Sequence, residues 1–141
     1  MANRSYLYSF RKNSKGEVSK IFDISEQNYQ IPIIYQILVS ENTQIVPSKI
    51  FEDTNALIGN AKEGRKKLDD FFLQLFAKNI FDKKELKSLQ KIFMAHLDTY
   101  TLDYFLFEPA EVIEMDDVDV NEQIKQLKKN IANYDLSLIH I

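Results

Sequence analysis

Two consecutive segments of the chain carry apolar residues at the spacing of an amphipathic helix. In residues 61–79 the apolar side chains recur at i, i+3, i+4, i+7 and i+8, at Leu68, Phe71, Phe72, Leu75 and Phe76. This spacing places them on one face of a helix. The second segment opens with Asp82 and Glu85, the pattern of an N-terminal cap, and continues with apolar residues at Leu86, Leu89, Phe93 and Leu97. The sequence therefore predicts a helical hairpin that turns at residues 79–81.

Strand patterns lie on both sides of this hairpin. Residues 5–10 alternate, with an aromatic face of Tyr6, Tyr8 and Phe10 and a nearly polar face of Ser5, Leu7 and Ser9. We expect the aromatic face to be the packing surface. Residues 11–16 predict a turn, and residues 49–52, 56–59 and 104–107 predict further strands. Pro109 favours a sheet edge or a bulge, and residues 112–113 are expected to continue the last strand.

Two more helices are expected from the pattern. Residues 25–40 predict a helix with an irregular start, in which Pro32 takes the first helical position. The β-branched residues there leave a strand as the alternative. Ile124, Leu127 and Ile131 mark a final helix. The sum is an α+β fold, in which a small, mainly antiparallel sheet has three to four helices packed on one face.

Length and composition indicate one soluble domain. A chain of 141 residues with 45% hydrophobic and 28% charged residues is typical of a single globular unit. The absence of cysteine excludes disulfides, thiolate zinc sites and a cysteine nucleophile within this sequence. We find no signal peptide and no apolar run near the roughly 18 residues of a membrane span. A pI near 5.4 argues against nucleic-acid binding. We expect a cytoplasmic protein without a nucleic-acid or membrane partner.

The last six residues, LSLIHI, coincide with the in-frame translation of the mosaic-end tag used in transposase-based sequencing libraries. We therefore expect a single domain over residues 1–135, truncated at its C-terminus, followed by translated adaptor at 136–141. The alternative is a genuine apolar tail.

Acidic residues are concentrated near the end of the chain. Residues 103–122 contain eight acidic residues and no basic one. One hypothesis is an acidic surface that steers a basic protein partner, formed by Glu111, Glu114, Asp116, Asp117 and Asp119. The alternative is that the three aspartates cap the final helix. The spacing of Glu108, Glu111 and Glu114 also suggests a divalent-cation or acid–base site, and the alternative to that site is a solvated strand edge. A calcium loop starting at Asp117 is excluded, because Glu122 replaces its glycine and Lys128 its final glutamate.

Few residues suggest chemistry. A shared polar pocket is one possible arrangement of six polar residues, Arg4, Tyr6, Asn28, Tyr29, Glu108 and Glu111. In the alternative, Arg4 pairs with a surface acid while Asn28 and Tyr29 build the start of the helix. His96 lacks a second histidine or a cysteine and is expected to be structural. Gly59 and Gly64 have the spacing of a phosphate loop but lack the following Lys-Ser/Thr. We expect no cofactor and no metal.

Several blocks resemble an uncharacterised bacterial family. Residues 1–9 read MANRSYLYS, like the opening of its members, and residues 25–40 resemble the block SEWNYxIPLxYKxLLS, with Gln27 in place of Trp. Gly59 and Gly64 resemble a GDxxxG pattern, with Asn60 in place of Asp. Residues 107–111 resemble LEPGE, with Phe107 and Ala110 departing. The resemblance implies a bacterial origin and supplies no activity.

The function expected from these observations is a protein-binding module, of an immunity or regulatory type. The motivation is the lack of catalytic motifs together with the acidic segment. The rival is an enzyme or small-ligand binder that uses a polar pocket near Arg4, Tyr29, Glu108 and Glu111. Convergence of these groups in one cavity would favour the rival.

Overall fold

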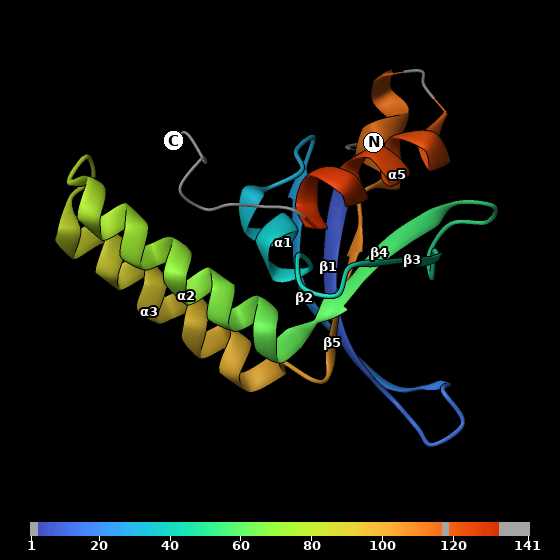
Figure 1. Cartoon of the computed structure of the whole chain (residues 1–141), viewed down its shortest axis with the longest axis horizontal. Coiled ribbons are helices and arrows are strands. Elements are labelled where there is room, and N and C mark those ends of the chain that lie inside the picture. The colour runs from blue at the N-terminus through green and yellow to red at the C-terminus, as the bar shows by residue number, and fades with distance from the viewer. Residues whose placement is uncertain (1–2, 117–118, 133–141) are drawn as a thin grey trace.

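The computed structural model describes residues 3–116 and 119–132. A five-stranded antiparallel sheet has the order β2-β1-β5-β4-β3 (Figure 1). Its strands are β1 (Arg4–Lys12), β2 (Val18–Asn28), β3 (Gln44–Pro47), β4 (Asn55–Asn60) and β5 (Tyr104–Glu108). The helices are α1 (Ile33–Leu38), α2 (Ala61–Lys78), α3 (Lys83–Tyr100), α4 (Ala110–Ile113) and α5 (Val120–Ala132), with a short 3-10 helix η1 (Glu114–Asp116). The predicted α+β fold is confirmed.

The helices gather on one face of the sheet. Every helix from α1 to α5 contributes buried residues to the main apolar core, which also contains Leu7, Leu57, Phe105 and Phe107 of the sheet. A second, smaller cluster contains only strand residues, Phe10, Ala56, Ile58 and Leu106. In Figure 1, α1 and α5 lie in front of the sheet, and the α2–α3 pair extends to its left. Residues 136–141, and with them the adaptor hypothesis, lie outside the described residues.

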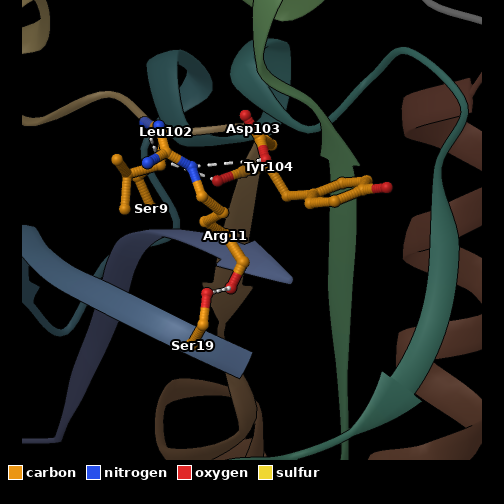
Figure 2. A network of polar contacts seen from close by, with 6 residues as sticks. All are labelled: Ser9, Arg11, Ser19, Leu102, Asp103 and Tyr104. Atoms are coloured by element: carbon orange, nitrogen blue, oxygen red, sulfur yellow. Dashed lines mark hydrogen bonds and ion pairs between the residues drawn. The ribbon is translucent and has the colours of Figure 1, made fainter. Parts of the chain in front are cut away.

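The packing face predicted for β1 is only partly right, because Phe10 is buried in the smaller strand cluster while the helices pack on the opposite face. Ser5, Leu7 and Ser9 are completely buried against the helices, whereas Tyr6 and Tyr8 are only half-buried. The serines are tolerated because their hydroxyls are paired. Ser5 Oγ donates to the carbonyl of Gln30 at 2.6 Å. Ser9 Oγ donates to the carbonyl of Tyr104 at 2.8 Å and accepts the N–H of Leu102 at 2.7 Å (Figure 2).

Long-range strand pairing explains the differences between the predicted and observed elements in the first half of the chain. Residues 25–28, predicted to start a helix, end strand β2 because they pair with residues 4–7 of β1. Pro32 precedes a helix of only six residues. The strand expected at residues 49–52 is a loop. The neighbour of β4 at the sheet edge is instead β3, at Gln44–Pro47.

The end of β5 also differs from the prediction. Pro109 follows the last residue of β5 and caps α4, so it interrupts no ladder. The strand is central, not an edge, because β1 and β4 pair with its two sides. Val112 and Ile113, expected to continue the strand, belong to α4.

The helical hairpin agrees with the sequence pattern. Asn60 and Asp82 cap α2 and α3, and Asn79 ends α2 in the left-handed conformation. Leu68, Phe72 and Leu97 are buried in the core. Leu89 is the exception, since it is 63% exposed. The described contacts of α3 with β2 lie farther along the helix, where His96 Nε2 donates to the carbonyl of Ile24 at 2.8 Å and Tyr100 packs on Phe22.

Gly59 and Gly64 make room for the backbone at the end of α1. A Cβ on Gly59 would lie 2.6 Å from Cα of Val39, and one on Gly64 would lie closer still to the carbonyl oxygen of Leu38. Both distances are too short for any side chain. The spacing that resembles a phosphate loop therefore serves close backbone packing.

Gly64→Ala should destabilise the protein by about 1–3 kcal/mol, the usual cost of overpacking. At a helix position with free space, replacing glycine by alanine would instead stabilise the protein by about 1 kcal/mol. Urea unfolding measures the difference, with Lys66→Ala at an exposed position of α2 as the control. A Gly64→Ala variant as stable as the wild type would contradict the close packing.

Phe72→Ala should reduce the free energy of unfolding by roughly 3–5 kcal/mol, because this side chain is only 4% exposed. Phe93→Ala should cost less, since Phe93 is partly buried at the edge of the same core. Leu89→Ala, on the same helix, is the control and should leave the melting temperature nearly unchanged. An equal loss in Leu89→Ala would show that the face of α3 is wrongly assigned.

Candidate functional site

The candidate site lies on the sheet face opposite the helices, which we call the open face. Successive side chains of a strand point to opposite faces of the sheet. Residues two apart on β1 therefore share a face, and the open face carries Arg4, Tyr6, Tyr8, Phe10 and Lys12. On β5 this face carries Tyr104, Leu106 and Glu108, which pair with Phe10, Tyr8 and Tyr6. Within residues 3–116 and 119–132, no helix contributes to the apolar cluster of this face.

Tyr6 and Tyr8 form a stacked pair with ring centroids 6.3 Å apart and an interplanar angle of 18°. The β1–β2 register places Glu26 beside Tyr6 and Asp23 beside Tyr8. Tyr6 Oη also donates to Oε2 of Glu111 at 3.3 Å. We call these five residues, Tyr6, Tyr8, Asp23, Glu26 and Glu111, the acid-rimmed tyrosine pair.

The neighbouring carboxylates affect the ionisation of both phenols. Burial raises the pKa of Tyr8 to about 12, and the negative charges of Asp23 and Glu108 add to the effect. Burial and then Glu111 raise the pKa of Tyr6. Both tyrosines therefore keep their protons at neutral pH and act as hydrogen-bond donors.

The residues predicted to form a polar pocket lie near one end of the open face, but the structure joins only some of them. Tyr6 is hydrogen-bonded to Glu111 and lies opposite Glu108 in the register. Arg4 pairs with Glu26 at 3.0 Å, which is the surface ion pair of the alternative prediction. The other half of that alternative is wrong, because Asn28 does not build the start of a helix but ends β2, opposite Arg4 in the register. Tyr29 has a left-handed backbone and is 56% exposed. Among the described residues no contact joins Arg4 or Tyr29 to Glu108.

Glu108 is buried rather than solvated at a strand edge, so that prediction is wrong. It is 0% exposed, because β5 is central and the β3–β4 loop covers its side chain. Its Oε2 accepts the N–H of Lys49 at 2.8 Å, whereas Oε1 is buried without a hydrogen-bond partner in the described part of the chain. Burial raises the pKa of this carboxyl group, although hydrogen bonds from Ser48 and Lys49 oppose the shift.

The five residues of the predicted acidic surface have different surroundings. Glu111 contacts Tyr6 and is half-buried, and Glu114 is exposed. Asp119 Oδ1 accepts the N–H groups of Asn121 and Glu122 at 3.1 and 3.4 Å, so it caps α5 as the alternative predicts. Asp117 and the side chain of Asp116 lie outside the described residues.

Asp23 and Glu26 are the site residues that sequence reasoning missed. They belong to β2, which the sequence pattern did not reveal, and their position beside the tyrosines depends on the β1–β2 register. A usable signal was present on the far side of the predicted turn, where apolar and polar residues alternate over residues 22–25.

Other kinds of site are not indicated by the described residues. Among residues 3–116 and 119–132, no three acidic or histidine side chains lie close enough together to hold a metal ion. None of the helices described has both the length and the apolar character needed to cross a membrane.

Glu108→Gln should change how stability depends on pH. Because the folded pKa lies above the ordinary 4.5, the stability associated with this carboxyl is fully present below that value and is lost as pH rises through the folded pKa. Glutamine can still accept from Lys49 and does not ionise. The variant should therefore gain stability relative to the wild type on going from acidic to neutral pH, as measured by urea unfolding. Glu114→Gln is the control, and an equal pH slope in the wild type and Glu108→Gln would contradict the buried carboxyl.

Comparison with known proteins places the chain in a family without assigning an activity. No curated protein matches it. No solved structure matches it either. A family profile described as a domain of unknown function, DUF7822, matches residues 10–141. The expectation of an uncharacterised family is thereby confirmed, whereas the resemblance of residues 1–9 precedes the matched region and stays a prediction. The match covers nearly the whole sequence, so this chain belongs to the DUF7822 family.

Proposed function

We propose that this protein is a protein-binding module and that the acid-rimmed tyrosine pair contacts a basic segment of its partner. The observation that carries the proposal is the position of two stacked tyrosines on the open face, with Asp23 and Glu26 of β2 and Glu111 of α4 beside them. Paired aromatic rings on such a face offer apolar contact area, while the carboxylates define the charge of the partner.

The chemistry of these residues suits arginine or lysine side chains. Tyrosine is enriched among the residues that contribute most to binding at protein interfaces. A cation above a tyrosine ring is attracted to the face of the ring, with about 0.5–1 kcal/mol at exposed sites. Asp23, Glu26 and Glu111 would attract the same cation and accept its hydrogen bonds. Because Arg4 already pairs with Glu26, binding would include competition with this internal cation.

Within this proposal the role is of an immunity or regulatory type in the cytoplasm of a bacterium. A small domain with net charge −3 is suited to associate with a basic protein. The bacterial setting is supported by the resemblance of the first two sequence blocks. A reducing compartment such as the cytoplasm is compatible with a chain that has no cysteine.

One observation favours the rival, an enzyme or small-ligand binder near Arg4, Tyr29, Glu108 and Glu111. The Oε1 atom of Glu108 is buried without a partner, and such groups occur at functional sites. Two observations weigh against it. Arg4 is taken by Glu26, and the β3–β4 loop separates Glu108 from solvent. Protein binding is therefore the better-supported function.

The test is the rate of association with a partner recovered by affinity capture. The variant Asp23→Asn/Glu26→Gln/Glu111→Gln should slow association by about tenfold or more at low salt, and the difference should shrink as salt screens the charges. Tyr8→Ala should mainly speed dissociation, since it removes contact area rather than charge.

A matched control removes three exposed carboxylates elsewhere, in Glu52→Gln/Asp69→Asn/Asp70→Asn. Because this control has the same net charge as the site variant, it separates local from global electrostatics. Equal slowing in both would reject the acid-rimmed tyrosine pair as the contact. Turnover of a small molecule that disappears in Glu108→Gln would instead support the enzyme.

A further inference from the structure

The other end of the open face contains a cavity of about 370 Å³, which we call the hairpin groove. Its floor is made by Phe10, Ile58 and Leu106, each no more than 3% exposed, and Val46 of β3 forms one side. The volume lies within the range of small-molecule sites, which are mostly apolar with a few polar groups. None of these residues belongs to the acid-rimmed tyrosine pair.

The walls of the groove are held in place by the fold. The β1–β2 hairpin projects away from the sheet (Figure 1), and its residues Gly16, Glu17 and Val18 line one wall. Asn13 Oδ1 accepts the N–H groups of Lys15 and Glu17 at 2.9 and 3.0 Å, which fixes the turn. Opposite, Lys49 lines the groove, and its backbone N–H is bound to Glu108.

The aromatic residues beside the groove are also fixed. Figure 2 shows Ser9 joined to Leu102 and Tyr104, and Arg11 paired with Asp103 at 3.6 Å. These contacts attach the segment that precedes β5, at Leu102 and Asp103, to strand β1. Tyr104 stacks on Phe10 with centroids 5.1 Å apart, and Nζ of Lys12 lies 5.0 Å from the centroid of the Tyr104 ring. A ligand would therefore meet a preorganised site.

The charges at the rim select the ligand. Lys12, Lys49 and Glu17 line the groove and are exposed, and no ion pair within the described residues involves any of them. The rim therefore carries one net positive charge above an apolar floor. We infer that the hairpin groove binds a small carboxylic acid with an apolar body, whose hydrocarbon part rests on Phe10, Ile58 and Leu106 while its carboxylate meets Lys12 and Lys49. This goes beyond the proposed protein contact and uses different residues, so either can fail without the other.

The test uses octanoate as the probe and the neutral 1-octanol as its matched analogue. Titration followed by amide chemical shifts should show saturable binding of octanoate, with shifts at Lys12, residues 16–18, Val46, Lys49 and Leu106. Octanol should bind several-fold more weakly, because it lacks the charge. Equal binding of both compounds, shifts located elsewhere, or no saturable binding of octanoate would overturn the inference.

Variants separate the charge from the cavity. Lys12→Gln and Lys49→Gln should each weaken octanoate binding by about three- to fivefold, as for one exposed ion pair. Lys20→Gln is a matched control. Like Lys12 above Tyr104, Lys20 lies over an aromatic ring, with its Nζ 4.8 Å from the centroid of Phe22, but it does not line the groove. Val46→Phe should fill the cavity and weaken binding by about tenfold or more, while its amide spectrum reports an intact fold. A loss in Lys20→Gln equal to that in Lys12→Gln, or unchanged binding in Val46→Phe, would overturn the assignment.

Discussion

The close approach of the backbone at the end of α1 to two glycines is the contact on which the helical side of the molecule depends. The backbone at Leu38 and Val39 lies against Gly59 at the end of β4 and against Gly64 in the second turn of α2. Polar groups of this buried connection are paired, since Thr43 Oγ1 donates to the carbonyl of Val39 and Asn60 N–H donates to that of Glu41. The contact fixes α1 and α2 relative to the sheet, and the apolar core forms between them.

Because the helices occupy one face, the other face is left to carry function. Its two ends differ in charge. Asp23, Glu26 and Glu111 surround the tyrosine pair, while Lys12 and Lys49 border the hairpin groove. Glu108 lies opposite Tyr6 in the register, on the same strand as Leu106 of the groove floor. A buried carboxylate at this position couples the covering loop to the sheet, since its only described hydrogen-bonded oxygen binds the Lys49 amide.

The functional residues were partly predictable. Tyr6 and Glu111, chosen for their residue types, are indeed in contact, although 105 positions separate them in the sequence. Glu108 was also predicted as a site residue, but it was expected at a solvated strand edge and is in fact buried. An acidic residue before a proline suggests an exposed end, and only the position of β5 between β1 and β4 buries it. Asp23 and Glu26 were missed because their importance depends on their neighbours across β1.

The sequence by itself determined the helical hairpin, the cap at Asp82 and the α+β class, because helix periodicity and capping depend on residues only three or four positions apart. The tertiary structure decided which face of β1 is buried, where β2 and β3 lie, and that Pro109 starts a helix. These outcomes depend on strand pairing between distant segments. Ser5 and Ser9 illustrate the difference. Their alternation with Leu7 suggested a polar face, and only the carbonyl and amide groups supplied by Gln30, Leu102 and Tyr104 made that face suitable for burial.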